Sequence, residues 1–123
     1  MKKNILALAV AAEAGLGVIL LAWPPIVVRL LFAAEISGIA VVVSRFGGIC
    51  LVGLGVACWP GNSASQPRNG MMTYSSLAML YLTYIGVREE MVGVLLWPAV
   101  VFHAILVVLL FRTRLKEEKM SAA

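Results

Sequence analysis

Long apolar runs separated by short polar breaks dominate this chain. A helix needs about 17–25 apolar residues to cross a bilayer, since it rises about 1.5 Å per residue. The runs that meet this length cover residues 4–23, 37–59, 71–87 and 91–111. The pattern predicts an all-α fold, in which a four-transmembrane-helix bundle forms a single membrane domain over residues 1–123.

The breaks between the runs differ in character. The Trp-Pro-Pro segment at residues 23–25 stops or redirects the first helix, because proline lacks a backbone N–H donor. Residues 26–35 then predict a short helix lying in the membrane interface, with a re-entrant segment as the alternative. The Gly, Ser, Pro and Asn residues of 60–70 predict an exposed cytoplasmic loop. The charged residues of 112–123 predict a cytoplasmic tail.

Composition supports a membrane protein. Hydrophobic residues make up 62% of the chain and charged residues 13%, against roughly 45–50% apolar content in soluble domains. The net charge of +4 comes from bases that flank the apolar runs, where they set orientation in a membrane. We therefore expect no nucleic-acid partner and no soluble catalytic domain.

The distribution of Lys and Arg predicts the orientation. In a four-span layout seven bases fall on one side of the membrane and two on the other. The larger set is Lys2, Lys3, Arg68, Arg112, Arg114, Lys116 and Lys119, and the smaller set is Arg29 and Arg88. By the positive-inside rule, we expect a multi-pass membrane protein with both termini in the cytoplasm.

Small residues recur at every fourth position in the first two spans. They are Ala7, Ala11 and Gly15 in the first span, and Ala40, Ser44 and Gly48 in the second. Such stripes allow helix backbones to approach closely in a membrane, so a tight contact between these spans is predicted. A flat ligand accommodated by these residues, such as a quinone or a pigment, is the alternative.

Polar residues inside the spans predict a mid-membrane cluster. Glu13 and Arg45 lie roughly 15 and 12 Å below the same membrane face, counted at the rise of a helix, so we expect an ion pair between them. Tyr81 and His103 fall near that depth, which predicts a polar cluster of Glu13, Arg45, Tyr81 and His103. The cluster either holds the helices together or forms a path for protons or anions.

Sequence motifs of enzymes are missing. We find no paired metal-ligand spacing, no nucleophile with a nearby base and no phosphate-binding loop. We expect no catalytic residue and no metal site, and the residues themselves imply no cofactor.

The layout resembles the broad DoxX-like group of small four-helix bacterial membrane proteins. The resemblance rests on the proline-broken segment 23–25 leading into VRLLF at 28–32, on RFGG at 45–48 and on Trp-Pro at 97–98. It implies a four-helix inner-membrane bundle, sometimes a subunit of a quinone-linked oxidoreductase, and so makes a quinone the candidate cofactor. No active-site residue is carried over.

Three hypotheses about function follow. The favoured one is a non-catalytic accessory or assembly subunit of a larger membrane complex, because the loops are minimal and no soluble domain is present. The second is a small transporter or proton-conducting bundle, suggested by the polar cluster. The third is a quinone-linked redox subunit of DoxX type. The expected partners are the lipid bilayer and other membrane protein subunits, or a second copy of the chain.

Overall fold

Helices account for nearly all of the structure. The computed structural model describes residues 2–61, 65–88 and 92–122. Within these ranges the chain forms five α-helices and no strand, which confirms the all-α prediction. They are α1 (Lys2–Ala22), α2 (Pro24–Phe32), α3 (Ile39–Ala57), α4 (Ser65–Arg88) and α5 (Leu96–Ala122).

Three of these helices, α1, α3 and α5, are long and apolar enough to cross a membrane. Helix α4 has sufficient length, 24 residues, but its Ser, Thr and Tyr side chains keep it less apolar than the others. The prediction of membrane-length helices is therefore confirmed for α1, α3 and α5. A fourth span formed by α4 stays a prediction.

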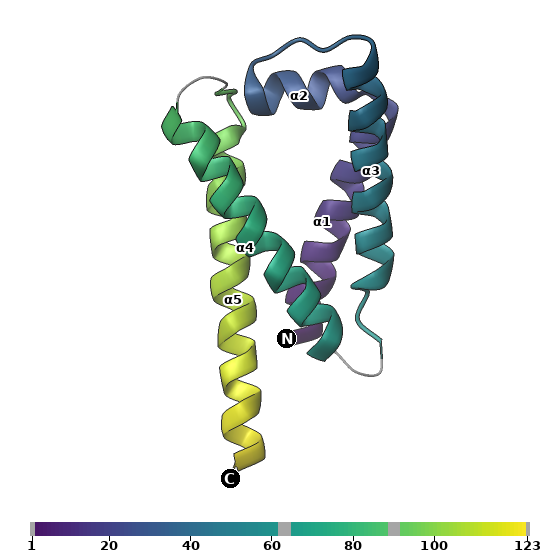
Figure 1. Ribbon diagram of the computed structural model, residues 1–123. Helices are drawn as coiled ribbons and strands as arrows, with labels where there is room; N and C mark the ends of the chain where they lie inside the picture. Colours follow the sequence, from purple (N-terminus) through teal and green to yellow (C-terminus); the bar gives the residue numbers. More distant parts are fainter. Residues whose placement is uncertain (1, 62–64, 89–91, 123) are drawn as a thin grey trace.

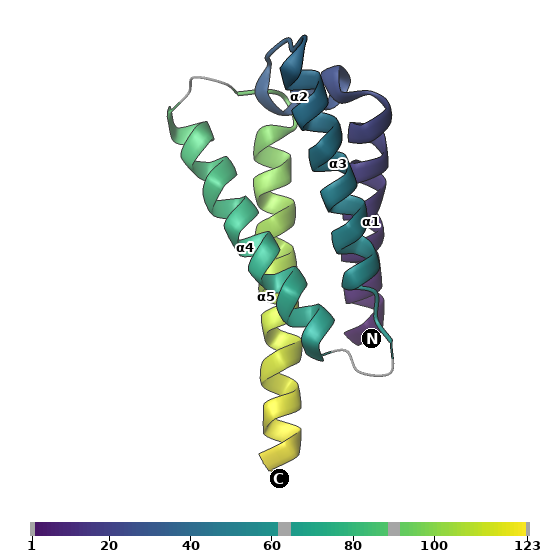
Figure 2. The same cartoon turned by 45° about the vertical axis from the view of Figure 1, so that its right-hand side comes forward.

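The long helices are arranged as two pairs. Helix α1 packs along α3, and α4 crosses α5 (Figures 1 and 2). The short helix α2 lies across one end of the molecule and contacts α1, α3 and α5. Both termini lie at the opposite end, where α5 extends well beyond the other helices (Figure 1).

Helix α2 begins earlier and ends earlier than the predicted interfacial segment 26–35. Pro24 and Pro25 occupy its first turn, where a proline loses no hydrogen bond because the first N–H groups of a helix have no partner in it. The helix ends at Phe32, and Ala33 adopts a left-handed conformation with φ of 52°. The prolines therefore start a new helix as well as ending α1.

Of the predicted loop 60–70, residues 62–64 lie outside the described part of the chain, and residues from Ser65 onward are helical. Pro67 lies in the first turn of α4, which tolerates proline, and Arg68 is buried. Tertiary packing at this end of the molecule therefore outweighs a local composition that is typical of loops. The predicted tail 112–123 also differs, since α5 continues without a break to Ala122.

Helix α5 begins at Leu96, later than position 91, because the residues before it bond to another helix. The N–H of Gly93 donates to the carbonyl of Leu31 at 2.9 Å, and the N–H of Leu95 donates to that of Leu30 at 2.8 Å. These two bonds join the end of α2 to the start of α5. A Cβ on residue 93 would collide with the Leu30 carbonyl, so this approach requires glycine.

The contact between α1 and α3 is a backbone contact. A Cβ added to Gly48 would lie 2.6 Å from the Gly17 carbonyl oxygen and 2.8 Å from the Leu21 nitrogen. Ala14 plays the corresponding part against Gly55. Gly48 belongs to the stripe predicted for α3, but on α1 the contact uses Gly17 and not Gly15, around which a Cβ would meet no atom within 4 Å.

The remaining predicted stripe positions lie outside the tightest part of this contact. Ala11 is exposed, and Ala7, Ala40 and Ser44 are only partly buried. A helix turns about 100° per residue, so Gly15 and Gly17 lie on nearly opposite sides of α1. The α1 positions that meet Gly48 and Gly55 are Val10, Ala14, Gly17 and Leu21, at spacings of four, three and four residues.

The apolar core joins the two pairs near the end that carries the termini. Its buried members come from the first half of α1, the residue that caps the end of α3, the first third of α4 and the middle of α5. They are Leu6, Ala9, Val10, Cys58, Met71, Leu106 and Leu110. The core therefore lies directly on the terminal side of the polar site described next.

Candidate functional site

A buried carboxyl group lies where α1 meets the other helix pair. Glu13 is 2% exposed and is among the most completely buried side chains. The hydroxyl of Tyr74 on α4 donates a hydrogen bond to its Oε2 over 3.1 Å. A carboxyl group in an apolar interior needs such a donor, because burying it without hydrogen bonds is costly.

His103 on α5 completes the site. Its Nδ1 lies 3.7 Å from Oε1 of Glu13, which is longer than a hydrogen bond. The His103 ring stands edge-on to the rings of Tyr74 and Phe102, with centroids 5.8 and 5.6 Å away. His103 is 5% exposed, and its Nδ1 has no hydrogen-bond partner among residues 2–61, 65–88 and 92–122.

The four residues of the predicted cluster separate into two groups. The structure brings Glu13 and His103 together, whereas Arg45 is exposed on α3 and Tyr81 is 64% exposed on α4. No ion pair between Glu13 and Arg45 occurs in the described part of the chain. Counting residues gives the depth of a side chain but not its direction around the helix. Glu13 points to α4 and α5, and Arg45 points outward.

Tyr74 takes the place predicted for Tyr81. Because α4 begins at Ser65, Tyr74 lies roughly 14 Å along it, close to the roughly 16 Å of Glu13 along α1. Tyr81 lies two turns further on. The sequence shows two tyrosines seven residues apart, on one face of α4. The residue at which α4 begins determines that Tyr74, and not Tyr81, lies at the level of Glu13.

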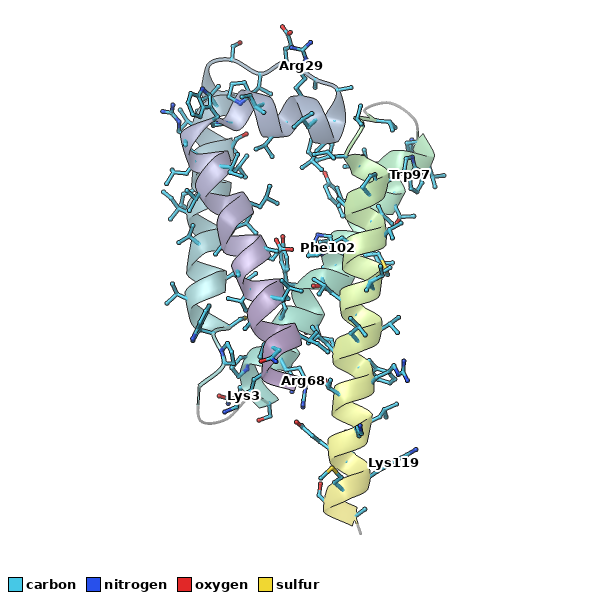
Figure 3. All side chains as sticks on the ribbon, turned by 180° about the vertical axis from the view of Figure 1, so that it is seen from behind. Lys3, Arg29, Arg68, Trp97, Phe102 and Lys119 are labelled. Atoms are coloured by element: carbon cyan, nitrogen blue, oxygen red, sulfur yellow. The ribbon has the colours of Figure 1, made fainter. Side chains whose placement is uncertain are left out.

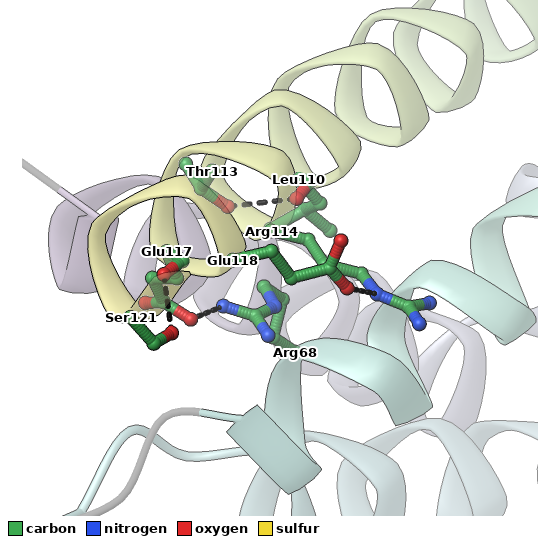
Figure 4. Close-up of polar contacts among 7 residues, drawn as sticks. All are labelled: Arg68, Leu110, Thr113, Arg114, Glu117, Glu118 and Ser121. Carbon is green, nitrogen blue, oxygen red and sulfur yellow. Dashed lines mark hydrogen bonds and ion pairs between the residues drawn. The ribbon is translucent and has the colours of Figure 1, made fainter. Parts of the chain in front are cut away.

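A second set of polar contacts lies at the end with the termini, and the sequence patterns did not predict it. Arg68 is buried and forms an ion pair with Glu117 on α5 (Figure 4). Nearby, Arg114 and Glu118 pair at 3.1 Å along the exposed side of α5. Figure 3 shows Lys3, Arg68 and Lys119 toward this end and Arg29 and Trp97 toward the other. The first pair locks the start of α4 to the extension of α5.

The site formed by Glu13, Tyr74 and His103, called the polar site below, has the chemistry of proton binding. Carboxyl, phenol and imidazole groups each accept or donate protons. In the described part of the chain, no three His, Cys, Asp or Glu side chains lie together in a way that could hold a metal ion. The arrangement also offers no nucleophile paired with a base for covalent chemistry.

Comparison of the chain with family models, with curated proteins and with solved structures gives no match. The resemblance to the DoxX-like group therefore stays a prediction.

Proposed function

We propose that this protein is a non-catalytic subunit of a larger assembly in the bacterial inner membrane. The observation that supports this most is the position of Arg45 on the outer side of α3. Helix α3 is one of the three helices that are long and apolar enough to span a membrane. An arginine there needs a partner, and none of the carboxylates in the described part of the chain pairs with it.

Arg45 lies roughly 9 Å along α3 from Ile39. Its side chain is exposed, and no carboxylate in the described ranges pairs with it. An arginine at the centre of a membrane helix costs about 2.5–3.5 kcal/mol on insertion scales, and one nearer the end, like Arg45, is also unfavourable unless it is paired or hydrated. A carboxylate on a neighbouring membrane helix would remove that cost.

A second copy of the chain is poorly suited to provide this carboxylate. The chain has six acidic residues, all of them glutamate, and only Glu13 lies within an apolar run. Glu13 is buried against Tyr74 and His103. A different membrane protein with an Asp or Glu at this depth is therefore the favoured partner.

The outer side of α4 supports the same proposal. Leu77, Tyr81 and Tyr84 follow one another at helical spacing and are 62, 64 and 55% exposed. A membrane helix rich in polar groups is stabilised when neighbouring helices offer hydrogen-bond partners. This side of α4 thus offers the assembly a second contact.

The experiment is purification in native lipid followed by native mass spectrometry. We expect the wild-type chain to carry a second membrane protein in fixed ratio. Arg45→Leu should lose that protein, and Arg45→Lys should retain at least part of it, since the charge is kept. Arg29→Leu, which removes an arginine from the short helix α2 instead of from a membrane-length helix, is the matched control and should retain the partner fully.

The proposal fails if the wild-type chain purifies alone in native lipid. It also fails if Arg45→Leu and Arg29→Leu release the partner equally. A partner retained by Arg45→Leu at the wild-type ratio would show that another surface makes the contact.

We further propose that the end carrying both termini faces the cytoplasm, with α4 as the fourth span, because seven bases lie toward that end against two toward the other. Single-cysteine labelling tests this after replacement of Cys50 and Cys58. In intact cells an impermeant thiol reagent should label Glu35→Cys and leave Gln66→Cys unlabelled. Labelling of Gln66→Cys but not of Glu35→Cys would show that the termini face the opposite side of the membrane.

The polar site supports a second candidate function, a small proton-conducting bundle or proton-coupled transporter. Three proton-exchanging groups from three helices meet beside the mid-membrane position of Glu13. In proteoliposomes, proton flux that disappears in Glu13→Gln while the folded protein persists would support this function. A quinone extracted from the purified chain would instead favour the redox role that the DoxX-like resemblance implies.

A further inference from the structure

A groove of about 930 Å³ lies between the first turn of α1 and the extension of α5. Four basic residues line it, Lys3 from α1 and Arg112, Lys116 and Lys119 from α5. Ile5 and Leu109 form part of its apolar wall. The groove therefore joins a strongly basic rim to an apolar wall.

The basic residues of this groove are available to a ligand. The nearby carboxylates are engaged elsewhere, since Glu117 pairs with Arg68 and Glu118 pairs with Arg114 (Figure 4). No carboxylate in the described ranges pairs with Lys3, Arg112, Lys116 or Lys119, and the groove itself has no acidic residue. The lining thus carries four positive charges and no negative one.

The groove lies where the apolar part of α5 gives way to its charged extension. Leu109 belongs to the apolar part, and Arg112 is the first base that follows it. Lys3 occupies the corresponding place at the start of α1. In a bilayer this level is the boundary between acyl chains and headgroups, where basic pockets bind anionic lipid headgroups.

We propose that this groove binds one anionic phospholipid from the leaflet at the end that carries both termini. The phosphate lies among Lys3, Arg112 and Lys116, which attract it by charge and donate hydrogen bonds to its oxygens. An acyl chain follows the wall formed by Ile5 and Leu109. A soluble anion would use only the basic rim, whereas a phospholipid uses both parts.

The test titrates the full-length, delipidated protein in detergent with phosphatidylglycerol or phosphatidylcholine and counts bound lipid by native mass spectrometry. We expect phosphatidylglycerol to bind as one tight equivalent and phosphatidylcholine to bind far more weakly. Removing two bases with Arg112→Gln and Lys116→Gln should lower the affinity for phosphatidylglycerol about 30-fold. The matched control, Arg29→Gln with Arg88→Gln, removes two bases at the other end and should leave the affinity within about twofold.

Competition separates a lipid from a free anion. Millimolar inorganic phosphate should not displace phosphatidylglycerol, because it cannot use the apolar wall. Ile5→Ser with Leu109→Ser should weaken lipid binding while leaving the basic rim intact, and circular dichroism checks that the helices persist. Displacement by phosphate, equal binding of the two lipids, or equal losses in the two base-deleted variants would each overturn the proposal.

Discussion

Helix α1 packs against α3 on one side and against α4 and α5 on another, and these two contacts are of opposite kinds. Against α3 it packs backbone to backbone through Gly17 and Gly48, with no polar side chain at the closest approach. Against α4 and α5 it presents Glu13, which accepts a hydrogen bond from Tyr74 and lies beside His103. The first contact depends on the absence of side chains, and the second depends on their chemistry.

The two contacts can serve different purposes, fixed packing of helices and a contact that depends on protonation. Close packing of small residues stabilises a helix pair at every protonation state, since nothing in the contact titrates. The polar site is sensitive to protonation and to single-atom changes, because the folded protein is destabilised when a buried polar group loses its hydrogen-bond partner. The α1–α3 contact is thus suited to a fixed scaffold. The contact at the polar site is suited to a change in stability with protonation.

The largest effect should come from adding one methyl group to the backbone contact. Gly48→Ala places a Cβ 2.6 Å from the Gly17 carbonyl oxygen and 2.8 Å from the Leu21 nitrogen. Because these atoms belong to backbone, the helices must separate, and we expect a loss at the upper end of the roughly 1–3 kcal/mol typical of overpacking. Unfolding in detergent, followed by tryptophan fluorescence, measures this loss.

Gly53→Ala on the same helix is the matched control for this change. A Cβ there would meet no atom within 4 Å, and alanine is up to about 1 kcal/mol better than glycine in a helix. Gly53→Ala should therefore be neutral or stabilising. Equal losses in the two variants would show that α1 and α3 do not approach at Gly48.

An intermediate effect is expected at the hydrogen bond between Glu13 and Tyr74. A double-mutant cycle with Glu13→Gln and Tyr74→Phe should give a coupling free energy within the roughly 0.5–3 kcal/mol typical of residues in contact. The cycle with Glu13→Gln and Arg45→Leu should be additive within about 0.5 kcal/mol. The same unfolding assay provides both cycles.

These two cycles decide between alternative partners for Glu13. A coupling free energy between Glu13 and Arg45 as large as that between Glu13 and Tyr74 would be evidence for the ion pair that the sequence predicts. Such a result would mean that the contact in the structure is not the one that stabilises the protein.

The smallest effect is expected at His103. Its Nδ1 lies beyond hydrogen-bond distance from Glu13, so His103→Gln should be almost silent. His103→Leu should cost less than about 0.6 kcal/mol, the average for a hydrogen bond between membrane helices, because Nδ1 has no such bond to lose among the described residues. A loss above about 2 kcal/mol in His103→Gln would show instead that His103 is an essential partner of the carboxyl group.

Much of the fold was accessible from hydrophobic periodicity, and the reasons are physical. Length and apolar content fix which segments can form membrane-length helices, so α1, α3 and α5 follow from composition alone. Proline allows two outcomes, a break or a new first turn. The sequence predicts breaks at residues 23–25 and at Pro67, whereas in the structure the prolines lie in the first turns of α2 and α4.

Only two of the three residues of the polar site could be predicted from the sequence. Glu13 and His103 stand out as the acid and the imidazole within apolar runs, which is an intrinsic property of the sequence. Their partner depends on how α4 is positioned along the bundle, and a one-dimensional pattern does not contain that information. Arg45 is a second example. The spacing along the chain predicts the depth of Arg45 in the membrane, but it does not predict toward which side of α3 the side chain points.

The two backbone bonds that join α2 to the start of α5 have a consequence for synthesis. The Leu30 and Leu31 carbonyls accept from Leu95 and Gly93, which leave the ribosome several seconds later at roughly 5–20 residues per second. Helix α3 emerges within that interval, so the contact of Gly17 with Gly48 can form before the chain is finished. Glu13, in contrast, stays without Tyr74 and His103 until the second half of the chain arrives.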